Sequence, residues 1–300
     1  MAHVFLSALE ENTVTGSFLE NSSALAHRIG ELVAAAAYEV IPLKGADQKV
    51  LEVPRATPLT ITCSPKFGLR RTLEHVASAS AQGFRVVPHL AARMVKDEKA
   101  LRSFVSTVVG LGVDELFVIG GDAEEPVGEF TSACEVLESL ARFDHGLRRI
   151  GVGCYPEGHP KIDEAELIRV LRDKQESAHY MVSQLCFDAA SLTRWIDTIR
   201  SADVRLPLRI GLAAPIKTAR LLELSMKIGV GQSVRYLQKQ HGMMRSLLLG
   251  RSYAPERLLS AMGGHLTEPA AGIEGLHMFT FNQLDVTVEW QRRLAARLGA

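Results

Sequence analysis

Residues 84–121, FRVVPHL-AARMVKDEKALRSFVSTVVGLGVD-ELFVIGG, contain the pattern that decides the fold. Two short runs of mostly apolar residues, 84–90 and 115–121, flank a segment in which 97–111 has helical periodicity. Strands that are apolar at nearly every position are covered on both faces, which is typical of parallel sheets with helices outside them. The stretch therefore predicts a strand–helix–strand unit of a parallel sheet.

The same alternation continues in both directions along the chain. It predicts eight strands, at 37–42, 58–63, 84–90, 115–121, 149–155, 180–187, 208–214 and 276–282. Helices are expected between them, at 69–81, 97–111, 127–142, 164–177, 190–202 and 216–227. Eight strands in strict alternation with helices favour an α/β fold of the (β/α)8 TIM-barrel type over an open sheet.

Two segments add to this barrel. Residues 1–35 are expected to form an N-terminal extension that packs on the barrel, with a helical pattern over 22–37. The barrel itself is expected over 36–300, with extra helices between strands seven and eight near 231–249 and 254–263. These helices are predicted to elaborate the barrel and not to form a second domain.

Composition excludes some classes of partner. The 300 residues include 34 basic and 34 acidic side chains, so net charge gives no reason to expect binding to nucleic acid or to an anionic membrane surface. No run approaches the ~20 apolar residues of a membrane span, and the N-terminus does not resemble a secretory signal. The four cysteines are widely spaced and predict reduced core thiols. We expect a cytoplasmic protein, either a monomer or a homo-oligomer.

Polar residues gather where the predicted strands end, which is where the active site of a barrel lies. Each has a structural explanation on its own: Asp122 could cap a helix, for example, and His89 could be a satisfied core histidine. Together they would face one mouth. The candidates are Glu39, Thr62, His89, Gly121, Asp122, Tyr155, His159, Gln184 and Gln283.

Glu39 is the most unusual of these residues. It interrupts the small and apolar run in AAAAYEVIPLKG, residues 34–45. An uncompensated buried carboxylate is costly, and desolvation is expected to raise its pKa. A carboxyl group that is partly protonated near neutral pH is suited to general acid catalysis. The alternative is an acid paired with a buried lysine or arginine, for which Lys44 is the nearest candidate.

From about residue 36 onward the chain resembles the methylenetetrahydrofolate reductases, a family of flavin-containing folate barrels. The segment YEVIPLK is similar to that family's FEFFPP. Further along, VVPHL, VIGGD, CYPEGHP, VSQLCFD and GLHMFTFN resemble its APHL, LRGD, YPEXHP, ITQFFFD and GLHFYTLN, in the same order. Six such segments over some 250 residues make a specific resemblance.

The resemblance implies FAD as the cofactor, NADH or NADPH as the co-substrate, and a role for each matching residue. Glu39 takes the position of the acid that protonates the folate nitrogen, and Asp122 that of an aspartate beside flavin and folate. Gln184 and Gln283 fall at positions that contact folate. The flavin-region positions are occupied by Thr62, His89, Gly121, Tyr155, His159 and Lys174, together with Phe130 near the cofactor.

The chain also departs from the family pattern. Gly120 stands in place of the LRGD arginine, Val170 and Asp173 in place of an asparagine and an arginine, and Gln283 in place of the TLNR arginine. These changes remove cations that would contact the flavin diphosphate and folate. The resemblance thus implies a reductase whose FAD is weakly held.

Three other functions stay open. The first is direct hydride transfer between NAD(P)H and folate without flavin. The second is a zinc-dependent methyl transferase, in which Cys63, Cys154 and Cys186 would bind the metal together with His89. The third is a folate-binding barrel without catalytic activity, which would not need a buried acid at Glu39.

Overall fold

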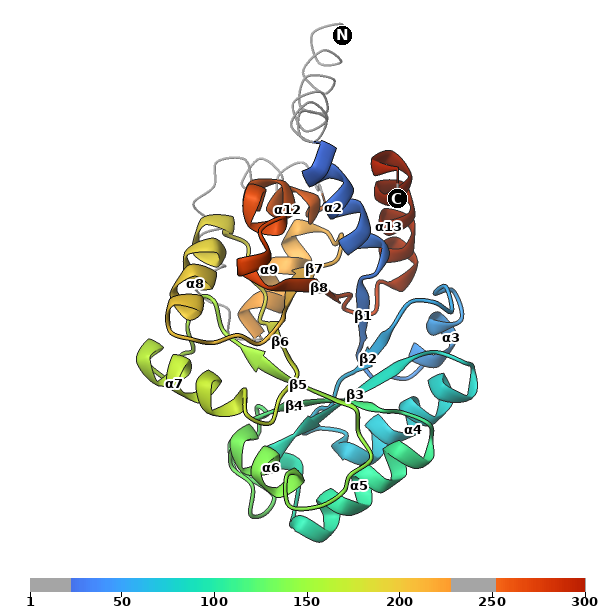
Figure 1. Cartoon of the computed structure of the whole chain (residues 1–300). Coiled ribbons are helices and arrows are strands. Elements are labelled where there is room, and N and C mark those ends of the chain that lie inside the picture. Colours follow the sequence, from blue (N-terminus) through green and yellow to red (C-terminus); the bar gives the residue numbers. More distant parts are fainter. Residues whose placement is uncertain (1–22, 228–251, 300) are drawn as a thin grey trace, which may run out of the picture.

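The computed structural model describes residues 23–227 and 252–299. Its centre is a closed barrel of parallel strands that pair in sequence order, with the last strand pairing with the first (Figure 1). The strands are β1 Ala37–Val40, β2 Leu59–Ile61, β3 Val86–Ala91, β4 Glu115–Ile119, β5 Arg149–Cys154, β6 Tyr180–Ser183, β7 Leu208–Ala213 and β8 Ile273–Phe279. The predicted TIM barrel is confirmed.

Helices surround the barrel on its outside (Figure 1). The α-helices are α2 Ser23–Ala34, α3 Ala46–Val50, α4 Gly68–Ala81, α5 Glu98–Gly110, α6 Ala133–Leu140, α7 Glu164–Lys174, α8 Ala189–Ser201, α9 Thr218–Lys227, α12 Glu256–Met262 and α13 Leu284–Leu298. Short 3-10 turns follow β3 and α12: η1 Ala92–Met94, η2 Gly263–Leu266 and η3 Pro269–Ala271. The helix expected near 254–263 is therefore present, whereas the one expected near 231–249 lies outside the described residues.

The prediction of a helix beginning at residue 127 is wrong, because α6 begins only at Ala133. Ser132 accepts a hydrogen bond from the Glu135 backbone N–H, and the Glu135 carboxylate accepts one from the Ser132 N–H, so this capping box fixes the start. The residues before it form a loop after β4. Strand β6 also ends earlier than predicted, at Ser183, so Gln184 lies just beyond it.

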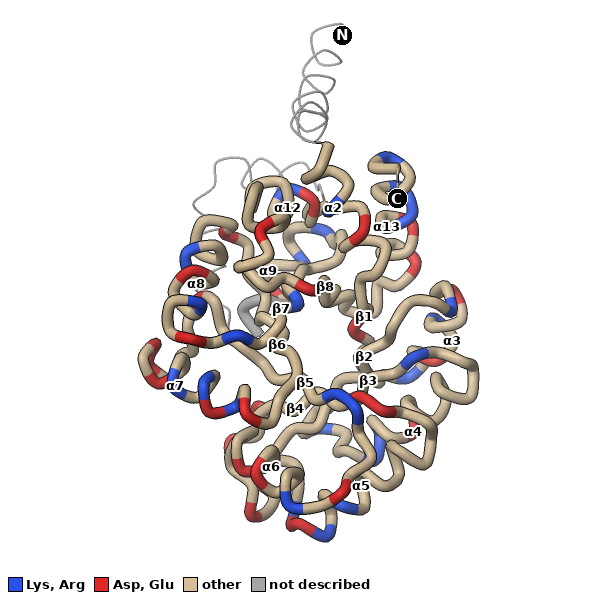
Figure 2. The backbone as a smooth tube through the Cα atoms, in the orientation of Figure 1, with Lys and Arg blue, Asp and Glu red and all other residues tan. Residues whose placement is uncertain are grey.

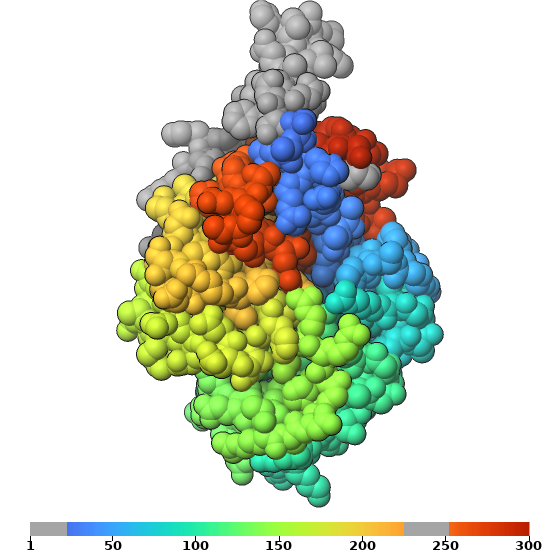
Figure 3. Space-filling view, in the orientation of Figure 1, coloured from blue at the N-terminus to red at the C-terminus, as the bar shows by residue number. Residues whose placement is uncertain are grey.

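The helix α2, predicted within 22–37, ends at Ala34 and packs beside α13 (Figures 1 and 3). One side chain of α13 links the two to the barrel. The Gln291 amide donates to the carbonyl of Val33 and accepts a hydrogen bond of 2.7 Å from the Tyr38 hydroxyl of β1. Because Tyr38 points outward to this layer, the next residue of the strand, Glu39, points into the barrel.

Charged residues of both signs lie mainly on the helices and the loops around the barrel (Figure 2). An exception is a buried network at the amino ends of the strands, centred on Glu115, which is 1% exposed. Glu115 accepts hydrogen bonds from Arg85 (2.5 Å) and Arg209 (2.8 Å), and Arg209 also donates to Glu274. The Arg209 guanidinium stacks 3.6 Å from the centre of the Tyr180 ring. This network closes the end of the barrel opposite to the predicted mouth.

Gly151 of β5 is needed for this packing. A Cβ atom at Gly151 would lie 2.2 Å from the Tyr180 ring, so any larger residue would displace that ring from the barrel floor. No helix within the described ranges has the length and apolar character needed to cross a membrane.

Candidate active site

Three polar side chains from β1, β3 and β8 meet inside the barrel: Glu39, His89 and His277. They are only 9%, 4% and 2% exposed. The register places Glu39 beside Phe279 and His277 beside Ala37, so the alternation of side chains turns Glu39 and His277 to the same inner face. The His277 Nε2 lies 3.1 Å from the Glu39 Oε2, at hydrogen-bonding distance. The barrel thus holds a buried acid–imidazole pair.

This pairing corrects the expectation of an acid without a partner in β1. The partner is neither a lysine nor an arginine: Lys44 is exposed, and the hydrogen bond comes from His277. The Thr280 hydroxyl also donates to the backbone carbonyl of Glu39, which fixes the end of β1 against the end of β8. His277 was not among the predicted site residues. The only hint in the sequence was that His277 is a single histidine among the apolar residues of the last predicted strand.

His89 completes the cluster from β3. Its ring centre lies 4.8 Å from that of Phe117 and 6.1 Å from that of His277. The His89 Nε2 is buried and has no hydrogen-bond partner in the described structure. Burial, reinforced by the neighbouring His277, lowers the pKa of His89 well below its ordinary value. Because its Nε2 is unpaired, His89 is not the satisfied core histidine considered as the alternative.

Asp122 lies at the carboxyl end of β4, exposed, and it influences three predicted site groups. Its charge raises the pKa of Cys63, of Tyr155 and of His159. Burial is the larger cause for each: it raises the pKa of Cys63 and of Tyr155 to about 12 and lowers that of His159. Asp122 does not cap α6, since Ser132 does. The structure therefore brings these four groups to one mouth.

The aromatic rings at this mouth are in contact. The rings of Tyr155 and His159 meet edge to face with centres 5.0 Å apart. The loop that follows β4 depends on Gly121, which has a φ of 92°. A Cβ atom there would lie 2.8 Å from the Cβ of Ala91. A glycine is needed at this position whether or not a cofactor contacts it.

The predicted ligand-binding amides and hydroxyl are half-buried at the strand ends. The Gln184 Oε1 accepts a hydrogen bond from the backbone N–H of Leu185, which leaves its NH2 group without a partner among the described residues. Thr62 uses its backbone carbonyl to accept from Thr72. Gln283 precedes α13, and its backbone carbonyl accepts from the Thr287 hydroxyl. Their side chains are thus available to a ligand.

Two predicted cofactor residues have different surroundings. Phe130 is 7% exposed and packs in the main hydrophobic core. Lys174 ends α7, and burial lowers its pKa, opposed by the nearby thiols of Cys134 and Cys154. Asp122, which influences Tyr155 and His159, is not among the groups that shift Lys174. A cofactor contact at Phe130 or Lys174 remains a prediction.

The three cysteines of the zinc alternative do not gather around His89. Cys154 is buried near Lys174 and Arg200, and Cys186 contacts the Glu157 carboxylate at 3.0 Å. Among residues 23–227 and 252–299, the potential metal-binding group is instead Glu39, His89 and His277.

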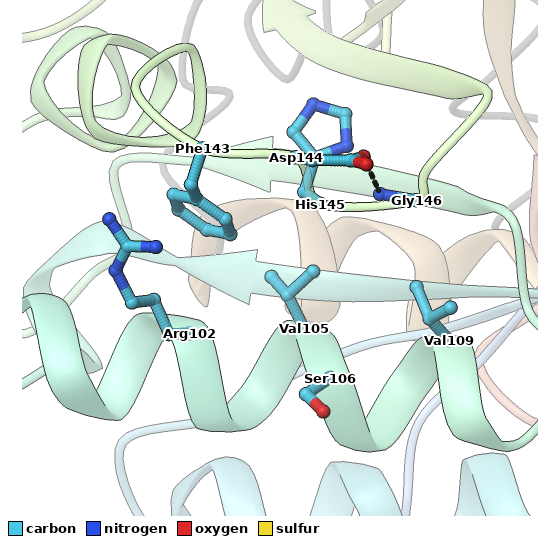
Figure 4. Close-up of a pocket in the computed structure, with 8 residues that line it drawn as sticks. All are labelled: Arg102, Val105, Ser106, Val109, Phe143, Asp144, His145 and Gly146. Carbon is cyan, nitrogen blue, oxygen red and sulfur yellow. Dashed lines mark hydrogen bonds between the residues drawn. The ribbon is translucent and has the colours of Figure 1, made fainter.

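A surface groove of about 420 Å³ lies elsewhere, between α5 and the loop before β5 (Figure 4). Its lining includes Arg102, Val105 and Phe143. The loop enters β5 at its amino end, so the groove is remote from the mouth where the predicted residues gather.

Comparison with known proteins agrees with the resemblance. A family profile described as methylenetetrahydrofolate reductase matches residues 57–294. Methylenetetrahydrofolate reductase 1 of Schizosaccharomyces pombe is 37% identical over 65 residues, which are 21% of this chain and 11% of that protein. The alignment thus spans about a tenth of the curated relative.

Solved structures with a similar fold have other descriptions. Oxaloacetate acetylhydrolase superposes with a TM-score of 0.50 at 11% identity, covering 91% of this chain and 86% of that one. A putative lyase/mutase from Burkholderia cenocepacia J2315 has a TM-score of 0.50 at 13% identity, covering 93% and 90%. At such identities the likeness concerns the fold alone. The family profile spans most of the sequence, and the chain therefore belongs to the methylenetetrahydrofolate reductase family.

Proposed function

We propose that the protein is an oxidoreductase that interconverts 5,10-methylenetetrahydrofolate and 5-methyltetrahydrofolate with NADH or NADPH. The observation that carries this proposal is the buried carboxyl group of Glu39, held by His277 inside the barrel of a chain that belongs to this family. A carboxyl group positioned by a buried hydrogen bond is suited to deliver a proton at one atom.

The proposed chemistry assigns different tasks to the two carboxyl groups. Glu39 donates a proton to a folate nitrogen, which opens the five-membered ring and leaves a methylene-iminium cation as hydride acceptor. Asp122 then stabilises the positive charge from the mouth, where its own charge already acts on Cys63, Tyr155 and His159. Gln184, through its NH2 group, and Gln283, through its side-chain amide, orient the folate or the nicotinamide.

FAD is the proposed cofactor, and bound FAD would pass the hydride from nicotinamide to folate. The residues at the strand ends suit the ring end of such a group, because they combine aromatic rings with the His89 Nε2, which has no hydrogen-bond partner among the described residues. They are Thr62, His89, Gly121, Asp122, Tyr155 and His159, and the proposed set also includes Phe130 and Lys174.

The diphosphate end has less support. Gly120 stands where the family has an arginine, and Arg169 of α7 is already paired with Glu166 at 2.6 Å and Asp173 at 2.7 Å. The Arg93 guanidinium donates to the carbonyls of Ala123 and Glu124. These engaged cations favour a second candidate, direct hydride transfer from NAD(P)H to folate without flavin.

We expect FAD to bind loosely, because the arginine at position 120 is missing and Arg169 is already paired within the chain. Each missing charge-assisted contact to phosphate costs about 1.5–3 kcal/mol. We expect the protein to purify with partial FAD occupancy and its activity to rise on added FAD, measured by the absorption spectrum and by turnover. Stoichiometric yellow protein that resists dialysis would contradict weak binding.

The proposed function is tested by methylenetetrahydrofolate-dependent oxidation of NADH and NADPH by the full chain, with and without FAD. Activity that requires both substrates supports the proposal. Colourless protein with full activity and no response to FAD would establish the flavin-free candidate. Folate binding without any turnover would overturn the proposal.

Replacing Gln184 by leucine tests the ligand contact at β6. Leucine has nearly the same volume but no hydrogen-bond donor or acceptor. The KM values for folate and for nicotinamide should therefore rise by a few-fold to about tenfold, as expected for the loss of one hydrogen bond. The melting temperature should change little. If the melting temperature fell strongly while the protein that remains folded kept normal kinetics, the role of Gln184 would be structural.

A further inference from the structure

We propose that Glu39, His89 and His277 form a binding site for one divalent transition-metal ion, of the class of Zn²⁺ or Co²⁺. Each residue offers one ligand atom, and these atoms lie within 4.8 Å of one another. Two imidazole nitrogens and one carboxylate oxygen are a donor set that such ions prefer, with at least one position left for water. Binding at this cluster goes beyond the proposed folate chemistry.

An independent observation points to a ligand at the same place. The His89 Nε2 is buried and has no hydrogen-bond partner among the described residues, although the side chain is only 4% exposed. An unpaired buried nitrogen is costly, and most buried polar groups in native structures have a partner in the protein or in ordered water, so an unpaired one points to a water or an ion at that place. An imidazole has two nitrogens, so a metal on one of them leaves the other for a cofactor contact.

The cluster is held on rigid elements. All three residues lie within strands, and the pairing of β1 with β8 fixes the spacing between Glu39 and His277. The Thr280 hydroxyl holds the backbone of Glu39. Little movement is therefore needed to bring the three ligand atoms from their present spacing to a common ion.

The surroundings of the cluster are apolar on two sides. The rings of Phe117 and Phe279 lie 4.8 Å from His89 and 4.9 Å from His277, measured between ring centres. An apolar shell lowers the local dielectric and strengthens the attraction between the Glu39 carboxylate and a cation. The buried cluster should therefore bind a metal ion more tightly than the same three residues would on an exposed surface.

Metal binding and the proposed proton transfer would exclude each other. A carboxylate that ligates a metal is deprotonated, so Glu39 cannot then donate a proton to folate. The metal-loaded protein should therefore lose turnover with methylenetetrahydrofolate and recover it when a chelator is added. This consequence, unlike metal binding itself, rests on the proposed function.

The test uses the untagged full chain, treated with a chelator and freed of it. Titration with Co²⁺ should produce visible d–d absorption that saturates at one ion per chain, and calorimetry with Zn²⁺ should give the same stoichiometry. His89→Gln, His277→Gln and Glu39→Gln should each weaken binding by more than about 100-fold, since even outer-shell partners are worth 10–100-fold. His145→Gln, a histidine change outside the cluster, should leave binding unchanged.

A direct readout on the unaltered protein guards against variants that fail to fold. Zn²⁺ should raise the melting temperature of the wild-type chain in proportion to the logarithm of its concentration above the dissociation constant. Failure of Co²⁺ and Zn²⁺ to bind stoichiometrically, or binding that folded cluster variants retain, would overturn the metal site.

The two proposals fail separately in this design. If metal does not bind but Glu39→Gln abolishes turnover, the metal site is wrong and the proposed function stands. If one metal ion binds at the cluster and turnover is undiminished, the metal site stands and the assignment of Glu39 as proton donor is wrong.

Discussion

Glu39→Gln should lower turnover with methylenetetrahydrofolate by about 10² to 10⁴, the usual cost of removing a positioned general acid. Glutamine has nearly the same shape as glutamic acid, and its amide can still hydrogen-bond to His277, so the fold and most of the folate affinity should persist. The amide N–H is far too weak an acid to transfer a proton to the folate nitrogen. The measurement is kcat in steady-state turnover, together with folate affinity by calorimetry.

Two comparisons separate a loss of chemistry from a general loss of function. Oxidation of NAD(P)H by an artificial acceptor does not involve the folate nitrogen, so it should be nearly unchanged in Glu39→Gln. Glu52→Gln, the same change at an exposed position outside the barrel, should behave as the wild type. Turnover of Glu39→Gln within a few-fold of wild type would exclude Glu39 as the proton donor.

The sequence pattern was sufficient to predict the barrel and the burial of Glu39 within its first strand. Near-continuous apolar strands between helical segments led to the parallel barrel, and the small and apolar residues around Glu39 led to its burial within β1. The mouth groups Asp122, Tyr155 and His159 were likewise predicted together, because parallel strands all end on one side of a barrel.

The partner of Glu39 could not be predicted in this way. It depends on how β8 closes onto β1, across 238 positions of sequence, and that register is set by the packing of the whole barrel. Local proximity suggested Lys44 instead. The start of α6 was missed for a different reason: apolar periodicity continued into the loop, whereas the capping box at Ser132 decided where the helix begins.

A second large effect is expected at the opposite end of the barrel. Glu115→Gln should lower the free energy of unfolding by about 3 kcal/mol, because Arg209 and Arg85 would lose their buried partner carboxylate. This loss of stability should be near the lower end of the range for a broken buried ion pair, because Arg209 still pairs with Glu274 and Arg85 is half-exposed. Urea denaturation followed by circular dichroism measures it.

A surface pair provides the matched control. Glu98→Gln removes an exposed carboxylate that pairs with Arg102 one helical turn away, and such pairs contribute about 0.5 kcal/mol or less. If Glu115→Gln shifted the urea midpoint no more than Glu98→Gln, the buried network would not stabilise the barrel. Activity of both variants, measured below the unfolding transition, should stay close to wild type, because Glu115 lies at the amino end of β4, away from the mouth.

The stability difference at Glu115 should also depend on pH in one direction. Burial raises the pKa of Glu115, but Arg209, the Tyr180 hydroxyl and Arg85 lower it more, so the pKa in the folded protein lies below the ordinary value of 4.5. A carboxylate with a lowered folded pKa contributes its full stability above the unfolded pKa and loses it as the pH falls through the folded pKa.

The gap in free energy of unfolding between wild type and Glu115→Gln should therefore be constant near neutral pH and should narrow below pH about 4.5. Urea midpoints measured across this range decide the matter, because a gap that stays constant or widens in acid would mean that the Glu115 charge is not what stabilises the barrel floor.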